Sequence, residues 1–233
     1  MRDSVRSWAA ISVLSAAATA IAQPVLFDNG PFITATGVGF GGADVSQTES
    51  GTTLFVGINA LGSDAAGGAV RIADDFTLIG GGARGHRLSR LTWFGFEPTS
   101  TGSTDNPFTL AYIAIYDGSP LAGGQLLAGD YSTNRFVSGE WTGAFRVPSG
   151  STSIGLNSWP IVAVTIDMSW APRLANGRYY LAVSLGDERS PTTGVFSSPV
   201  TPRRATDNAD RYVSGAWVAS PFDFPFVLFG ACP

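Results

Sequence analysis

The stretch Ala69–Leu78 reads AVRIADDFTL, and its pattern decides the fold class of the chain. Apolar side chains fall on alternate positions, the spacing of one face of a β-strand; they are Val70, Ile72, Phe76 and Leu78. Asp74 interrupts this face. The stretch therefore predicts a strand with one buried face, crossed by a single carboxyl group.

Similar strand-like segments follow on either side of this stretch, rich in β-branched and aromatic residues: Leu88–Phe96, Phe108–Tyr116, Ile161–Met168, Arg178–Leu185 and Phe224–Phe229. Gly-rich and Pro-containing loops separate them, with 29 Gly and 14 Pro in the chain. No long segment carries a helical apolar stripe, and strands without helical crossovers pair antiparallel. We therefore predict an all-β fold, an antiparallel β-sandwich resembling a jelly roll, with Gly-rich loops.

The composition allows a sizeable core and excludes several classes of protein. Of 233 residues, 44% are hydrophobic and 14% are charged, with a formal net charge of −4. All basic residues are Arg, and an acidic balance of this kind excludes a typical nucleic-acid binder. After the N-terminal segment, no apolar run is long enough to predict a membrane span.

The first 22 residues have the features of a secretory signal. Arg2 and Arg6 precede an apolar stretch that ends Ala20-Ile21-Ala22, the small-x-small pattern of a cleavage site. We therefore predict a signal peptide over 1–22 and a single β-sandwich domain over 23–233, with 23–68 as an irregular N-terminal extension. The expected location is secreted, either extracellular or periplasmic.

Three short motifs occur in order along the chain: ADDF at 73–76, IYDGSP at 115–120 and YYLAVS at 179–184. In this order the chain resembles a group of secreted bacterial exoprotein domains of uncharacterised activity, over about residues 72–209. The resemblance implies a β-sandwich module on an exported, often surface-sorted protein. It implies no catalytic residues.

Aromatic side chains could form a platform on which sugar rings stack, and the candidates are Trp93, Trp141, Trp159 and Trp170. Trp159 and Trp170 lie in predicted loops and are expected to face solvent. We accordingly expect a non-catalytic structural or adhesive module. Its partners would be extracellular polysaccharide or other cell-surface components.

The alternative function is a carbohydrate-active hydrolase. Such an enzyme needs two carboxyl groups across one glycosidic bond, and the candidates are Asp74, Asp75, Glu97, Glu140 and Asp167. The chain has no GxSxG motif, which argues against a serine hydrolase of that type. Spacing alone does not show that any two carboxyl groups converge.

No cofactor is predicted, apart from a structural calcium ion. Calcium takes six to eight oxygen ligands, and aspartates in loops and at strand ends could supply them: Asp74, Asp75, Asp207 and Asp210. Asx-turns and capping explain the same residues equally well.

The chain has one His and one Cys, which excludes an internal disulfide and a multi-histidine metal site. His86 follows the glycine loop 80–85 and is predicted to be solvated. Cys232 stands next to the C-terminal Pro233. It is interpreted as a free thiol or as the site of an intermolecular link.

Overall fold

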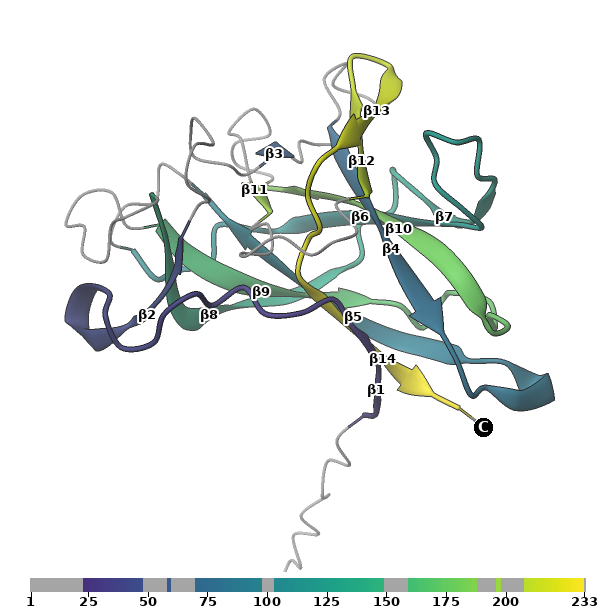
Figure 1. Cartoon of the computed structure of the whole chain (residues 1–233), viewed down its shortest axis with the longest axis horizontal. Coiled ribbons are helices and arrows are strands. Elements are labelled where there is room, and N and C mark those ends of the chain that lie inside the picture. Colours follow the sequence, from purple (N-terminus) through teal and green to yellow (C-terminus); the bar gives the residue numbers. More distant parts are fainter. Residues whose placement is uncertain are drawn as a thin grey trace, which may run out of the picture.

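The computed structural model describes residues 23–47, 58–59, 70–97, 103–148, 159–187, 196–197 and 208–232. The regular structure of this part of the chain is almost entirely β, with strands in two sheets (Figure 1). Its short 3-10 segments are η1 (Phe40–Gly42) and η3 (Gly82–Arg84). The predicted all-β sandwich is therefore confirmed.

The larger sheet, called sheet A here, contains six strands in spatial order: β1 (Val25–Asp28), β14 (Phe226–Ala231), β5 (Arg87–Phe96), β9 (Trp159–Asp167), β8 (Phe136–Val147) and β2 (Asp44–Gln47). Two further short strands, β3 (Ile58–Asn59) and β11 (Phe196–Ser197), bring it to eight. Among the described strands, neighbours pair antiparallel except β2 and β8, which are parallel. Both β1 and β2 are edge strands, so part of the predicted N-terminal extension joins this sheet.

The smaller sheet, sheet B, contains six strands in spatial order: β13 (Ala216–Ser220), β12 (Ala209–Val213), β4 (Arg71–Leu78), β10 (Gly177–Gly186), β6 (Leu110–Tyr116) and β7 (Leu126–Asp130). The hairpin between β12 and β13 turns at Ser214 and Gly215, both with positive φ. This is the conformation that a two-residue hairpin turn requires, and Gly adopts it without strain.

The main core lies between the two sheets and follows from strand register. Val183 on β10 pairs with Ile72 on β4 and with Ile113 on β6, so three apolar side chains form one row facing inward. The corresponding inward residues of sheet A include Leu91 and Trp93 on β5. Burying such rows on both sheets is the main favourable term in folding.

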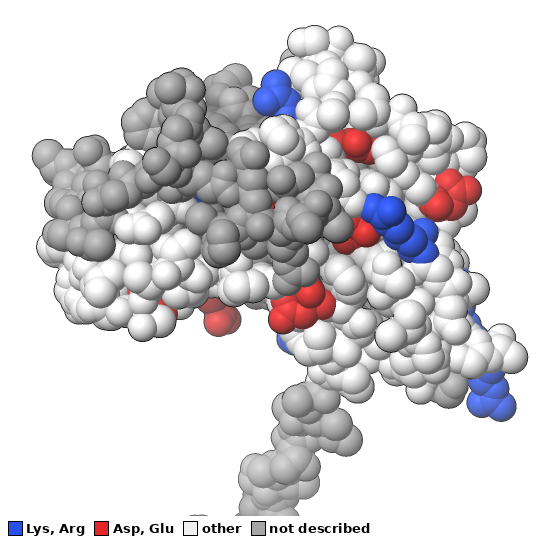
Figure 2. All heavy atoms as spheres, in the orientation of Figure 1, with Lys and Arg blue, Asp and Glu red and all other residues white. Residues whose placement is uncertain are grey.

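Residues 1–22, where the signal peptide was predicted, lie outside the described residues, as does most of 48–69. Among the residues that are described, no helix has the length and apolar character needed to cross a bilayer. Charged side chains are sparse and scattered over the face shown in Figure 2, in keeping with the low charge content.

Candidate functional site

Two of the four tryptophan candidates belong to the core. Trp93 is fully buried and its indole stacks on Phe226, with ring centroids 5.3 Å apart. Trp159 starts β9, is only 4% exposed and stacks on Phe96. The expectation that Trp159 faces solvent is therefore wrong, because the residue begins a central strand. Neither indole presents a free ring face to a ligand.

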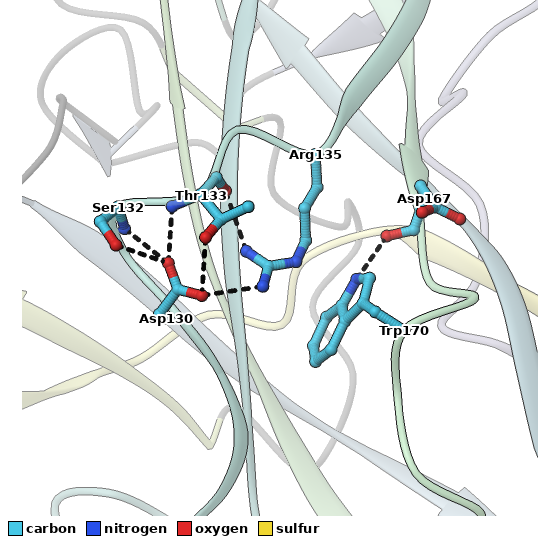
Figure 3. A network of polar contacts seen from close by, with 6 residues as sticks. All are labelled: Asp130, Ser132, Thr133, Arg135, Asp167 and Trp170. Carbon is cyan, nitrogen blue, oxygen red and sulfur yellow. Dashed lines mark hydrogen bonds and ion pairs between the residues drawn. The ribbon is translucent and has the colours of Figure 1, made fainter.

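Trp170 is half-buried and takes part in a polar network near the end of β9 (Figure 3). The Arg135 guanidinium covers one face of its ring at 4.3 Å, and the indole N–H donates to the Asp167 carbonyl oxygen at 2.8 Å. Arg135 in turn pairs with Asp130 at 2.8 Å. Hydrogen bonding from Arg135 lowers the pKa of the Asp130 carboxyl. Trp170 thus supports a loop rather than an open platform.

Trp141 on β8 is the remaining candidate, and it is 39% exposed. Its indole N–H donates to the Ala144 carbonyl oxygen at 3.1 Å, and its ring lies 5.5 Å from that of Phe145. These contacts fix the ring orientation while leaving much of the ring in solvent. At Gly143, which has a positive φ, the space where a side chain would begin is empty.

Asp74 lies on the inward face of β4 and is fully buried. Its carboxylate accepts hydrogen bonds from Asn29 Nδ2 at 2.9 Å, from the Phe224 backbone N–H at 2.5 Å and from the Asp75 backbone N–H at 2.9 Å. Burial raises the pKa of Asp74 well above its ordinary value, and the nearby charges of Asp223 and Asp75 add to this. Its oxygens are therefore used within the fold.

The other described calcium candidates are held by different partners. Asp75, on the opposite face of β4, pairs with Arg178 at 2.8 Å and accepts from Asn208 Nδ2. Asp210 accepts from Ser119 and from the Leu121 backbone N–H. Asp207 lies outside the described residues. No group of three or more Asp, Glu, His or Cys side chains in the described ranges is arranged to hold a metal ion. The calcium prediction thus has no support in this part of the chain.

The carboxyl groups proposed for a hydrolase are spread along the sheets. Arg90, near the start of β5, pairs with Asp167, whereas Glu97 directly follows the end of β5, roughly 23 Å away at about 3.3 Å per residue. Glu140 pairs with Ala163, roughly 13 Å along β9 from Asp167 by the same measure. Paired glycosidase carboxyls stand about 5–9.5 Å apart. These pairs do not fit that geometry.

A second cluster of large side chains covers the outer face of sheet B. Arg71 stacks between two tyrosine rings, with its guanidinium carbon 3.7 Å from the Tyr131 ring centre and 4.3 Å from that of Tyr212. Burial raises the pKa of the Tyr131 phenol. Three partly buried aromatic residues pack on small and aromatic side chains here: Tyr116, Tyr131 and Trp217 on Ala73, Tyr180 and Ala182. This face is consequently occupied by the protein's own side chains.

His86 and Cys232 form a contact that the sequence did not indicate. The Cys232 Sγ lies 3.0 Å from His86 Nδ1, and the other ring nitrogen, Nε2, lies 2.9 Å from the Asn176 Oδ1. His86 is 1% exposed, so the prediction of a solvated histidine is wrong. Cys232 is a free, exposed cysteine.

Pairing of β14 with β5 explains why these residues meet. Ala231, the last residue of β14, pairs with Arg87, the first residue of β5, so Cys232 just after β14 lies next to His86 just before β5. Asn176 lies in the loop before β10. Leu174 in the same loop forms backbone hydrogen bonds with His86, which hold the loop beside it. A His directly before one strand and a Cys directly after another were the available signals, but nothing local indicates that the strands are neighbours.

Comparison with protein-family models, with curated proteins and with solved structures found no match to the chain. The resemblance to secreted exoprotein domains therefore stays a prediction.

Proposed function

We propose that the chain is an exported structural or adhesive β-sandwich module, and that it contacts extracellular polysaccharide through Trp141. The exposed indole of Trp141 is the observation that carries this proposal. Export rests on the signal-like sequence of residues 1–22.

The orientation and the surroundings of the Trp141 ring support its role as a sugar contact. The indole N–H is used by Ala144, so the exposed part of the ring is mainly its apolar surface. A rigid, half-exposed aromatic ring provides contact area at low entropic cost. Gly143, two residues further along the chain, leaves open space beyond its Cα.

The spacing of the carboxyl groups favours binding over hydrolysis. Asp167 lies too far along the strands from Glu97 and from Glu140 to form a hydrolytic pair with either. Asp74 is buried and engaged by three N–H donors. A carbohydrate hydrolase built on these residues has no supporting observation.

The proposal is tested by affinity electrophoresis of the purified protein in gels containing a neutral glucan, a chitin-derived polymer or an acidic polysaccharide. We expect retardation by at least one polymer, and a reduction in affinity of about tenfold for Trp141→Ala, equivalent to about 1.4 kcal/mol.

Val137→Ala is the matched control, because Val137 is also an exposed apolar residue on β8 (58% exposed). Its variant should keep wild-type retardation. No retardation in any polymer, or equal retardation of wild type and Trp141→Ala, would overturn the proposed role of Trp141.

A further inference from the structure

We propose that Cys232, His86 and Asn176 form a base-activated thiol site that accepts an acyl group from an ester or thioester. Cys232 is the nucleophile, His86 the general base, and Asn176 a positioning residue. The site is independent of polysaccharide binding. Cys232 lies beside the start of β5, whereas Trp141 is in register, through Val162, with Gly95 near the end of that strand.

Hydrogen bonding assigns the protonation of the imidazole. The Asn176 Oδ1 accepts the Gly81 backbone N–H at 3.0 Å, which identifies this atom as the amide oxygen because a backbone N–H only donates. An amide oxygen only accepts, so His86 Nε2 must carry a hydrogen. In the neutral ring, Nδ1 then carries no hydrogen and has a lone pair available. Nδ1 is the atom that faces the Cys232 sulfur.

The surroundings hold the imidazole in this position. Gly81 packs directly on the ring, where a Cβ would lie 2.4 Å from Nε2. His86 exchanges two backbone hydrogen bonds with Leu174, at 2.7 and 3.0 Å. The base is therefore buried and fixed while the sulfur at its edge is exposed. A nucleophile next to a base that a third group orients is the arrangement that activates cysteine in covalent catalysis.

The chemistry follows from these positions. The Cys232 proton moves to His86 Nδ1, and the sulfur attacks the acyl carbon to form a carbon–sulfur bond. The alkoxide or thiolate of the donor leaves and takes the proton from Nδ1. Water then attacks the thioester while Nδ1 accepts one of its protons. The carbon–sulfur bond breaks, the carboxylic acid is released, and the leaving sulfur takes the proton from Nδ1 to restore the thiol. No oxidant or reductant is needed.

The oriented imidazole favours acyl transfer over disulfide exchange. An alkoxide needs a proton in order to leave, and a base that becomes an acid supplies it. The thiolate released from a disulfide or from a thioester departs readily without one, so this preference applies to ester donors. Since Cys232 is exposed, the tetrahedral intermediate faces water. We therefore expect activated esters and thioesters, rather than amides, to react.

The first test measures alkylation by iodoacetamide against pH, with any affinity tag kept away from the C-terminus. An isolated thiol, with a pKa of about 8.5, loses about 160-fold in rate between pH 8.5 and pH 6. We expect wild-type protein to lose less than about tenfold over this range. Asn176→Ala should follow the isolated thiol. Asn176→Asp keeps an acceptor for Nε2–H and should restore the wild-type profile.

The second test mixes the protein with p-nitrophenyl acetate. We expect a burst of about one nitrophenolate per chain and an acetyl adduct on Cys232 by peptide mass spectrometry. Cys232→Ser should abolish the adduct, and Asn176→Ala should slow its formation at least tenfold. Circular dichroism should show that both variants stay folded.

Three results would overturn the inference. One is a wild-type alkylation profile that matches an isolated thiol. Another is the absence of a Cys232 acetyl adduct. The third is a Cys232 that forms a mixed disulfide with oxidised glutathione but no acyl adduct, which would assign the site to thiol exchange instead.

Discussion

The two faces of β4 are formed by alternating residues of one strand, yet different kinds of side chain cover them. Inward-facing Ile72, Phe76 and Leu78 pack against sheet A in a large apolar core. Outward-facing Arg71 and Ala73 lie under aromatic side chains from the same sheet and its hairpin. A second sheet covers the first face, whereas single side chains cover the other.

This difference explains where polar groups are accepted. On the outer face the Arg71 guanidinium spreads over the Tyr131 and Tyr212 rings, which attract a cation through their π-electrons. On the inner face the polar Asp74 needs dedicated donors from Asn29 and Phe224. We therefore expect the inner face to be the more sensitive one, and substitutions along β4 can test this.

The largest effect is expected for Phe76→Ala on the inner face. Phe76 is fully buried and contacts the rings of Phe27 and Tyr179. Truncation of a buried Phe leaves a cavity and costs about 3–5 kcal/mol. Urea denaturation should show this loss. Thr77→Ala, at the adjacent exposed position, should change stability by less than about 0.5 kcal/mol. Equal losses would contradict the contrast between the faces.

A smaller loss is expected for Asp74→Ala. The substitution removes the acceptor of the Phe224 N–H, of the Asp75 N–H and of one Asn29 Nδ2 hydrogen, while Asn29 Nδ2 keeps its bond to the Phe224 carbonyl oxygen. We expect the variant to lose about 2–3 kcal/mol of stability at pH 5. Each buried donor left without an acceptor costs about 1–3 kcal/mol, and part of this loss is offset because the variant no longer buries a polar carboxyl group. Denaturation at constant pH measures it; wild-type stability in the variant would show that these bonds contribute nothing net.

The same residue predicts a pH dependence. The folded-state pKa of Asp74 lies above its ordinary value of 3.8, so the folded chain holds this proton more tightly than the unfolded chain. Its contribution is fully present below about pH 4 and is lost as pH rises through the folded pKa. The stability of wild type relative to Asp74→Asn should therefore fall with rising pH. A constant difference from pH 4 to pH 8 would contradict this.

The smallest effect is expected for Arg71→Met on the outer face. Methionine keeps much of the side-chain volume but loses the attraction to two tyrosine rings, which is worth about 1–2 kcal/mol in total. Arg178→Met is the control, because the Arg178 side chain is 53% exposed and its pair with Asp75 contributes at most about 1 kcal/mol. An Arg71 variant no less stable than the Arg178 variant would show that stacking does not stabilise this face.

Most of the strands could be predicted from the sequence, because alternation of apolar side chains is local. The stretch around Asp74 was predicted to be a strand whose apolar face is crossed by one carboxyl group, and β4 has this arrangement. Asp74 keeps the alternation and points inward like Ile72 and Phe76. Two of its hydrogen-bond donors come from residues that are 45 and 150 positions away in the sequence, so no local pattern could predict them.

Exposure of the candidate side chains was harder to predict. Trp141 and Trp159 were both candidates for a sugar contact, yet one is 39% exposed and the other is buried. Trp159 stacks on Phe96 because β9 lies beside β5. A tryptophan in a strand becomes core or surface according to what the opposite sheet and the neighbouring strands place over it.

By itself, the sequence determined the β class and the alternation of faces, because both depend on side chains two residues apart. Only the tertiary structure decided which strands are neighbours. Every β-ladder uses the same backbone hydrogen bonds, so the choice of partner depends on side-chain packing across whole sheets. The contact between His86 and Cys232 spans 146 positions and exists because β14 lies beside β5.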